Sequence, residues 1–270
     1  MAFDVRNFVI DRPTRFVMLH SSTSEILWTI DQVENPSLSM SADSVDATDA
    51  IGNRIMTFDR AKNAEFSAES SLFNLGLAAA QFGTTKRIAA TGANLTVPKF
   101  ETITIPSSGT SVTLSKTPKG AAAAGIPYIY KLNTDSSIAT KYPYAASASA
   151  NAFTFTSTTL TFPTSLQPGD RIFVVYEYEA DGETNNGAAM VTADAVNFPT
   201  AGKGILEVLG KDVCDPSTLY YAYIIFPNAK LMSDVDIPFT TEGKHPFTIR
   251  ANQDYCDVDK KLFSIVVPEA

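Results

Sequence analysis

The fold of this chain is decided by residues 37–70, whose sequence is SLSMSADSVDATDAIGNRIMTFDRAKNAEFSAES. Residues 37–42 and residues 64–69 each alternate polar and apolar side chains, which is the period of a strand with one buried face. Between them, residues 43–53 carry three aspartates and end in a Gly-Asn turn, so we expect an exposed loop. The pattern predicts two antiparallel strands joined by a long acidic connection.

A short helix is predicted directly after the second of these strands. Its apolar positions repeat at helical spacing: Leu72, Leu75, Ala79 and Phe82. Either Ser70 or Ser71 is the expected N-cap, and Gly83 is the expected end of the helix. The apolar residues of the two strands are expected to pack on this helix through Leu72 and Leu75: Leu38, Met40, Phe66 and Ala68.

The composition narrows the classes of function. The chain has 270 residues, of which 19% are charged, and a formal net charge of -8. A protein that reads a nucleic acid sequence carries a basic stripe, which is missing here. The start of the chain lacks the segments of a signal peptide, and no apolar run approaches the roughly 20 residues that cross a bilayer. We therefore expect a soluble protein that is made in the cytoplasm and inserts into no membrane.

The amino-acid composition changes twice along the chain, which predicts two domains. After Gly83 the character changes, and residues 101–179 are rich in Ser, Thr, Ala and Pro and contain short strand-like runs, of which residues 171–179 are the clearest. Residues 181–187 have the composition of a linker or loop, and a second set of strand-like runs begins after them.

Two details of the main domain are specific predictions. Residues 1–15 are either an arm that docks on a neighbouring copy or a frayed end. Residues 219–226 are apolar at nearly every position, which predicts a central strand covered on both faces. The Pro-Asn-Ala-Lys segment at residues 227–230 should break that strand.

Residue types that carry catalysis or bind metals are sparse. His20 and His245 are the two histidines, and neither belongs to a pattern with a nucleophile. Cys214 and Cys256 have no C-x-x-C spacing, so we interpret them as reduced thiols, and whether they meet in space stays open. We expect no catalytic residue, no metal site and no cofactor, and therefore no enzyme.

Two groups of segments, in this order along the chain, carry a resemblance to a known family. The first comprises residues 47–55 and 64–73, and the second comprises residues 206–216, 225–231 and 246–251. In these segments the chain resembles the major tail tube proteins of long-tailed bacteriophages. The resemblance implies a mainly β fold, an antiparallel β-sandwich or barrel with one α-helix and a long exposed β-hairpin. It also implies one β-sandwich domain made of residues 1–95 and 186–270, interrupted by a β-rich insertion at residues 96–185. The insertion is similar to the immunoglobulin-like or related β units of phage structural proteins.

The resemblance also implies a function and partners. The chain would be a structural virion protein whose copies, typically six to a ring, form the stacked rings of the tail tube, the conduit for genome ejection. Its partners would be further copies of itself and other phage tail proteins, with transient and non-specific passage of DNA. The ring symmetry, the host and whether the tail contracts stay open.

The hairpin supplies the candidate residues for assembly. We expect its connection and second strand to contact a neighbouring subunit through Asp46, Asp49, Ile51, Asn53, Ile55, Met56 and Phe58. The lumen candidates are polar positions on the two strands: Ser39, Ser41, Asp43, Glu65 and Glu69. An acidic or neutral lumen would let DNA pass without sticking, because like charges repel.

Two other functions are compatible with the sequence. A capsid decoration or cement protein would share the β-rich and acidic character of the chain. A host-adhesion module that binds carbohydrate would use aromatic rings that stack on sugars, for which the candidates are Tyr128, Tyr130, Tyr142 and Tyr144. The simpler interpretation of these tyrosines is packing within strands and interfaces.

Overall fold

The computed structural model describes residues 7–183, 186–253 and 258–269 of the chain. The chain divides into two compact units: unit 1 comprises residues 1–86 and 191–270, and unit 2 comprises residues 87–190. Each unit has a hydrophobic core of its own. Unit 2 is therefore an insertion in the sequence of unit 1, and its ability to fold alone stays a prediction.

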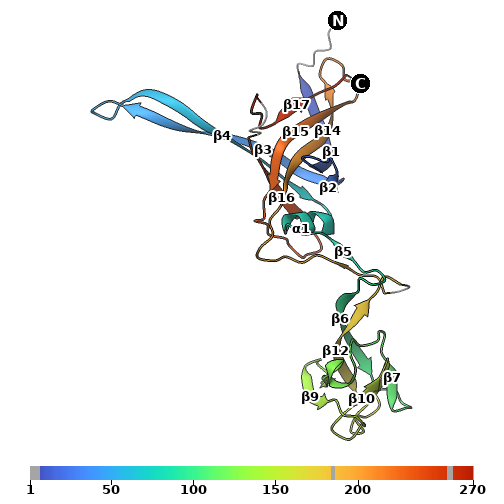
Figure 1. The fold of residues 1–270 in the computed structure, drawn as a ribbon. Helices are drawn as coiled ribbons and strands as arrows, with labels where there is room; N and C mark the ends of the chain where they lie inside the picture. The colour runs from blue at the N-terminus through green and yellow to red at the C-terminus, as the bar shows by residue number, and fades with distance from the viewer. Residues whose placement is uncertain (1–6, 184–185, 254–257, 270) are drawn as a thin grey trace. The chain divides into compact units, whose positions relative to one another are not determined.

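Unit 1 is built on one antiparallel sheet (Figure 1). Its strands follow the order β2-β1-β14-β15-β16-β4-β3, and β17 pairs with β15. The strands are β1 (Phe8–His20), β2 (Ile26–Ile30), β3 (Val33–Thr48), β4 (Arg54–Ser70), β14 (Ala201–Asp212), β15 (Tyr220–Leu231), β16 (His245–Ala251) and β17 (Ser264–Val266). The three strands β14, β15 and β16 from the C-terminal part of the chain thus lie in the middle of the sheet, between the N-terminal pairs β2-β1 and β4-β3.

The sheet curls, so that strands far apart in its order meet across the core. Phe16 on β1 and Phe66 on β4 are separated by three strands, yet their ring centroids lie 5.5 Å apart. Phe16 also stacks on Trp28 of β2 at 5.1 Å, and Phe247 of β16 meets both of these rings edge-on. All four aromatic side chains are buried, and aromatic side chains bury more apolar area than any others. This cluster holds the sheet in a barrel-like curve.

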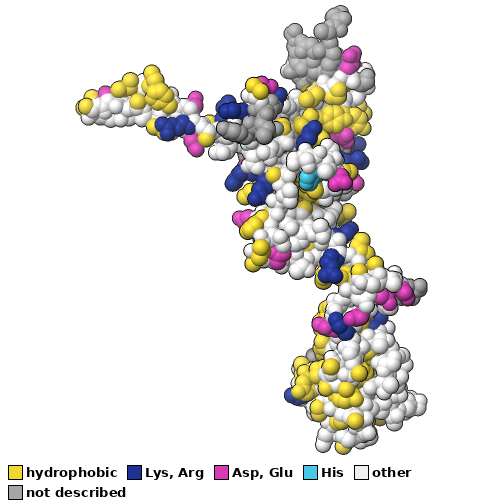
Figure 2. Space-filling model, viewed as in Figure 1, with side chains coloured by type: hydrophobic (Ala, Val, Ile, Leu, Met, Phe, Trp, Pro, Cys, Tyr) yellow, Lys and Arg dark blue, Asp and Glu magenta, His cyan; other side chains and the backbone are white. Residues whose placement is uncertain are grey.

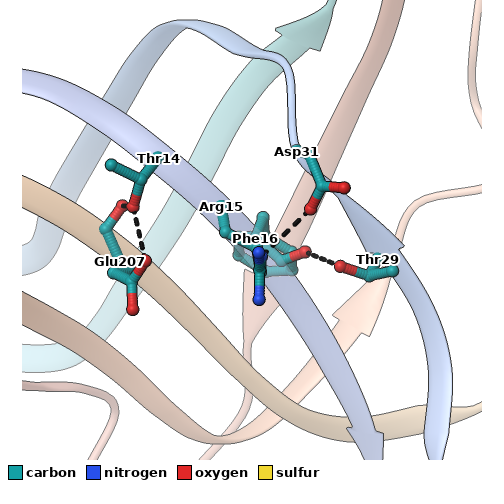
Figure 3. A network of polar contacts seen from close by, with 6 residues as sticks. All are labelled: Thr14, Arg15, Phe16, Thr29, Asp31 and Glu207. Carbon is teal, nitrogen blue, oxygen red and sulfur yellow. Dashed lines mark hydrogen bonds and ion pairs between the residues drawn. The ribbon is translucent and has the colours of Figure 1, made fainter.

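Side chains add to the backbone ladder around β1 (Figure 3). Thr14 Oγ1 donates a hydrogen bond to Glu207 Oε1 of β14 at 2.7 Å, and Thr29 Oγ1 of β2 donates to a backbone carbonyl of β1 at 3.2 Å. Arg15 Nε lies 3.0 Å from Asp31 Oδ1, directly after β2. The first two bonds fix β1 between its neighbours, whereas an exposed ion pair such as the third adds little stability.

The first strand is longer than the sequence pattern predicts. It begins at Phe8 and pairs with β14 along its whole length, from Asp212 to Gly202. Residues 8–15 therefore belong to the sheet, and the prediction of an arm or a frayed end is wrong for them. Residues 1–6 lie outside the described residues.

β15 is central in the sheet, but two predictions about it are wrong. The strand continues through Pro227 to Leu231 instead of breaking. Its ladder with β14 shifts register opposite residues 227–228, so the proline lies at a β-bulge, where no ladder hydrogen bond from its nitrogen is needed. The prediction that both faces of this strand are covered is also wrong, because the side chain of Tyr221 is 48% exposed.

The helix α1 (Leu75–Gln81) follows β4, but its cap differs from the prediction. Asn74 is the N-cap instead of Ser70 or Ser71, since its Oδ1 accepts hydrogen bonds from the nitrogens of Gly76 at 2.8 Å and Leu77 at 3.1 Å. An asparagine oxygen satisfies the free N–H groups of a first helical turn as well as a serine oxygen does.

The helix also packs through other residues than predicted. Its buried side chains are Leu77, Ala78, Ala79 and Gln81. Leu72 precedes the helix and is 65% exposed, and Met40 is exposed as well, so the predicted packing through Leu72 and onto Met40 is wrong. The predicted end at Gly83 is confirmed: its φ is +70°, and a Cβ there would lie 2.5 Å from the backbone of Phe198.

Unit 2 consists of two antiparallel sheets around the second core. One has the order β6-β12-β8-β9, the other has the order β10-β11-β7, and β5 pairs with β13 beside them. The strands are β5 (Arg87–Ile88), β6 (Leu95–Thr104), β7 (Ser111–Thr113), β8 (Tyr128–Leu132), β9 (Ile138–Pro143), β10 (Thr154–Thr156), β11 (Thr159–Thr161), β12 (Arg171–Ala180) and β13 (Ala189–Met190). Ile172 of β12 and Leu160 of β11 share one buried cluster, so the two sheets pack face to face. An immunoglobulin-like topology stays a prediction.

The predicted fold class is confirmed in its main features. The described residues are mainly β, with antiparallel sheets, a single α-helix and the long hairpin of β3 and β4. The hairpin is the feature that separates unit 1 from an ordinary small barrel.

Candidate assembly surface

The hairpin of β3 and β4 projects from unit 1 (Figure 1). Next to the sheet, Ala64, Phe66 and Ala68 of β4 are buried, whereas residues 54–63 of the same strand are all exposed. The predicted acidic loop is wrong for most of residues 43–53, because β3 continues to residue 48 and pairs with β4 almost to the turn. The outer half of the hairpin is thus a two-stranded ribbon, and such ribbons are only marginally stable alone in water.

Asp49 closes the turn at the tip. Its Oδ1 accepts hydrogen bonds from the nitrogens of Ile51 at 3.0 Å and Asn53 at 2.8 Å, and its Oδ2 accepts one from Asn53 Nδ2 at 3.0 Å. Two hydrogen bonds from Asn53 lower the pKa of Asp49, and the bond from its backbone nitrogen has a larger effect than the bond from its side chain. Gly52 provides the positive φ of +91° that the turn requires. Asp49 and Asn53 therefore shape the tip, and their predicted role in a subunit contact stays a prediction.

One face of the outer ribbon is apolar. Val45 lies opposite Phe58, and Ala47 lies opposite Met56, so the four side chains share a face. Val45, Met56 and Phe58 are about half exposed, and Figure 2 shows hydrophobic side chains gathered along one edge of the hairpin. We call Val45, Ala47, Met56 and Phe58 the apolar face. Exposed apolar groups grouped in this way mark interaction sites more often than single exposed residues do.

The opposite face is polar and satisfied within the hairpin. Asp46 Oδ2 lies 2.8 Å from Arg54 Nε, and Thr57 Oγ1 donates a hydrogen bond to Asp46 Oδ1 at 2.6 Å. Ser44 and Asp59 lie opposite each other on the same side. Asp46 thus lies on the other face from Met56 and Phe58, although the sequence grouped them as one set of contact candidates.

Two isoleucines extend the apolar surface towards the tip. Ile51, in the turn, is 85% exposed. Ile55 is an extra residue of β4, since Ala47 and Thr48 pair with Met56 and Arg54, and it is also exposed. A bulge of this kind turns the end of a ribbon and increases its twist.

The lumen candidates lie nearer the sheet. Ser39 and Glu65 are cross-strand partners, and Ser41 lies opposite Asn63 on the same face. Arg250 of β16 lies beside Glu65 and donates to its Oε1 from Nε at 2.8 Å and from Nη2 at 2.7 Å. The carboxylate is therefore paired with a cation that the sequence reasoning did not anticipate, because 185 residues separate the two.

The other two lumen candidates are separate from this group. Asp43 is exposed on β3 where the ladder with β4 shifts register. Glu69 accepts a hydrogen bond from Asn35 Nδ2 at 2.8 Å and lies 3.7 Å from Lys244 Nζ. Lys244 also pairs with Glu34 at 2.6 Å, and this pairing raises the pKa of the lysine. The assignment of all five residues to a lumen stays a prediction.

His245 has a structural role in unit 1. His245 is buried, its Nδ1 accepts from the nitrogen of Asn74 at 3.3 Å, and its Nε2 lies 2.7 Å from Gln81 Oε1. Burial lowers the pKa of His245, so the neutral imidazole joins α1 to β16. Cys214 is exposed, and Cys256 lies outside the described residues.

Two further findings concern the whole of the described chain. No three His, Cys, Asp or Glu side chains are grouped so that they could hold a metal ion in residues 7–183, 186–253 and 258–269. None of the helices in these same ranges has the length and apolar character of a membrane span.

One comparison with known proteins identifies a family. A family model described as the YomU/Tube protein family matches residues 8–256, which include all of unit 2, most of unit 1 and the whole hairpin. No curated protein matches the chain.

Proposed function

We propose, since this chain belongs to the YomU/Tube protein family, that it is a structural subunit of a phage tail tube and not an enzyme. In this proposal the chain is a virion component, its copies form rings, typically of six, and the rings stack into the conduit through which DNA leaves. The observation that carries the proposal is the hairpin, whose outer half is apolar on one face and has no second layer.

The apolar face of the hairpin is the proposed contact between stacked rings. Burying the exposed parts of Val45, Met56 and Phe58 on a second copy removes apolar area from water, at about 25 cal/mol per Å². The contact also covers the two-stranded ribbon with a second layer, and such a ribbon is only marginally stable alone in water. A projecting element that docks elsewhere on an identical chain makes a heterologous contact, and contacts of this type generate rings or open stacks.

The edges of the sheet are the proposed contact within a ring. Among the described residues, β2 and β3 are the two outermost strands of the sheet order in unit 1. An exposed edge offers unpaired N–H and C=O groups to another chain. Pairing of β2 in one copy with β3 in the next would continue the sheet around a ring and leave no free edge.

The five residues predicted to line the lumen are proposed here for the same role. Ser39, Ser41 and Glu65 form one face, on which Arg250 offsets the charge of Glu65. Such a face would be close to neutral and would attract phosphate weakly. Weak attraction suits a conduit, because each unpaired cation that contacts DNA releases counterions and favours binding.

The test compares the two faces of the hairpin in otherwise matched variants. Met56→Ser with Phe58→Ser removes the apolar face, and Thr57→Ser with Asp59→Ser alters the polar face by the same number of substitutions. We expect the first variant to remain a folded monomer, by circular dichroism and size-exclusion chromatography, and to form no tubes in negative-stain images. The second variant should form tubes of normal diameter.

Deletion of residues 46–53 is a more severe test of the same contact. It removes the tip but none of the buried residues of unit 1, so the thermal unfolding midpoint should change little. Tubes of normal length from this deletion, or from the apolar-face variant, would show that stacking uses another surface.

A further inference from the structure

The two sheets of unit 2 have outer faces of opposite character. On the sheet of β10, β11 and β7, the outer positions are all hydroxyl residues: Ser111, Thr113, Thr154, Thr156, Thr159 and Thr161. Their neighbours Phe155 and Leu160 point into the core. This is the usual pattern of an antiparallel sheet with one face in water.

The outer face of the other sheet is aromatic. Phe173 of β12 lies opposite Tyr130 of β8, and Phe100 of β6 lies opposite Val175 of β12. Tyr128 alternates with the buried Ile129 and so shares the side of Tyr130. We call Phe100, Tyr128, Tyr130, Phe173 and Val175 the aromatic face.

The geometry of the aromatic face is flat and accessible. The rings of Phe100 and Phe173 stack with centroids 6.2 Å apart and planes within 12°. Phe100 is 63% exposed and Tyr128 is 40% exposed, and the ammonium of Lys141 stands 4.5 Å above the ring of Tyr128. The ammonium occupies one face of the Tyr128 ring, so a sugar that stacks on that face takes the place of Lys141. Tyr142 and Tyr144 do not contribute, since Tyr142 is buried and Tyr144 packs on Phe153.

The size of the aromatic face argues against a protein partner. A large aromatic side chain can bury about 150–250 Å², so the exposed parts of Phe100 and Tyr128 amount to roughly 200 Å². A stable protein contact covers about 800 Å² on each partner. The area suits a small, flat ligand instead.

The chemistry of the aromatic face favours an uncharged sugar polymer. Unit 2 has seven Lys and Arg against seven Asp and Glu, so it attracts neither polyanions nor polycations as a whole. A pyranose ring with equatorial substituents has a face of C–H groups, and this face is complementary to the negative face of an aromatic ring. Thr102, Lys141 and Glu177 on the same side provide donors and acceptors for its hydroxyl groups.

We propose that the aromatic face of unit 2 binds a neutral β-linked polysaccharide, with Phe100 and Tyr128 as the rings on which the sugars stack. The site is separate from the hairpin and holds whether or not the chain builds a tube. It would give the protein a second activity, attachment to a glycan surface, in a part of the chain outside the proposed assembly contacts.

The experiment uses the full chain with chitin and cellulose as insoluble probes and chitohexaose in calorimetric titration. We expect binding to at least one probe, and Phe100→Ser or Tyr128→Ser should weaken it tenfold or more. Thr156→Ala on the hydroxyl face is the matched control and should bind like the parent chain. Circular dichroism melting confirms that each variant is folded, because the substituted residues lie outside the buried core.

A crossed comparison separates this proposal from the proposed function. Phe100→Ser should lose glycan binding and still form tubes, whereas Phe58→Ser in the hairpin should lose tubes and still bind glycan. Failure of the parent chain to bind any of the three probes would overturn the proposal. So would a concentration-dependent dimer of the hairpin deletion that Phe100→Ser abolishes, because it would assign the face to a second copy.

Discussion

The two units of this chain share a β architecture but divide its charge unequally. Unit 1 carries fourteen Lys and Arg against twenty-two Asp and Glu, while unit 2 carries seven of each, so the whole net charge of -8 lies in unit 1. The difference teaches that the long-range electrostatic field of the chain comes from unit 1, and in the tube that we propose this unit would determine the effect on DNA. A unit without net charge adds no long-range field, which is compatible with an insertion that contributes a surface of its own.

The units also differ in how their polar groups are buried. In unit 1, the buried pair of His245 and Gln81 ties the helix to the sheet without a charge. In unit 2, Glu101 accepts hydrogen bonds from Tyr176 and from Ser115 Oγ, the latter at 2.7 Å, and burial together with the Glu101 contact raises the pKa of Tyr176 to about 12. One unit relies on a neutral imidazole and the other on an ionised carboxylate, so the two should respond to acid differently.

The largest expected effects come from matched substitutions in the two cores. Phe66→Ala in unit 1 and Phe153→Ala in unit 2 each remove a fully buried ring and should destabilise by about 3–5 kcal/mol. If the units fold separately, scanning calorimetry of each variant should show one transition lowered and the other unchanged. A single shifted transition in both variants would mean that the two cores unfold as one.

Two glycines provide a smaller, matched pair of backbone tests. Gly83 has a φ of +70°, and a Cβ added there would lie 2.5 Å from the backbone of Phe198. Gly182 has a φ of +80°, and a Cβ added there would lie 2.4 Å from the backbone oxygen of Ala89. An L-residue in this region costs roughly 1–2 kcal/mol, to which the displaced backbone adds. Gly83→Ala should lower the transition of unit 1, and Gly182→Ala that of unit 2. Equal effects of both changes on one transition would contradict the division at these residues.

As the pH falls, unit 1 should lose stability before unit 2 does. Burial lowers the pKa of His245, so the unfolded chain takes up a proton near pH 6.5 before the folded chain does, and the stability of unit 1 declines below that pH. Burial raises the pKa of Glu101, but the bonds from Tyr176 and Ser115 outweigh it, and the net pKa is below 4.5. The stability that Glu101 contributes is present above pH 4.5 and is lost as the pH falls through its lowered pKa.

The measurement for this prediction is thermal unfolding at pH 7.5, 5.5 and 4. Unit 1 should lose stability by pH 5.5, and unit 2 should weaken only towards pH 4. His245→Asn cannot titrate near pH 6, so it should flatten the response of unit 1 between pH 7.5 and 5.5. A slope that persists in this variant would assign the effect to another group.

The smallest expected effects come from ion pairs at the surface. Glu65 and Arg250 are 41% and 51% exposed, so Glu65→Gln should change the stability of unit 1 by less than about 1 kcal/mol. Asp170 and Lys131 in unit 2 are 20% and 32% exposed at 2.7 Å, and Asp170 also accepts from the nitrogen of Gln167. Asp170→Asn should therefore cost more than Glu65→Gln in urea unfolding. The reverse order would show that exposure does not determine how much each of these two ion pairs contributes to stability.

The sequence predicted those parts of the hairpin that depend on neighbours in the chain. The alternation at residues 64–69 and the exposed apolar character of Ile51, Met56 and Phe58 were correct, because period-2 patterns and hydropathy are local properties. The separation of the two faces could have been read from the alternation of Val45 and Ala47 with Asp46. The acidic residues instead favour a loop at this place, because clusters of polar residues are typical of connections between strands.

The sequence by itself determined that the chain is mainly β, that Gly83 ends the helix and that a long hairpin precedes it. Only the tertiary structure decided what depends on distant segments: the pairing of residues 8–15 with β14, the bulge that accommodates Pro227, and the cation beside Glu65. The physical reason is that a strand has no hydrogen-bond partner within its own segment. Its partner, and therefore the neighbours of each side chain, are fixed only when segments up to two hundred residues apart come together in the sheet.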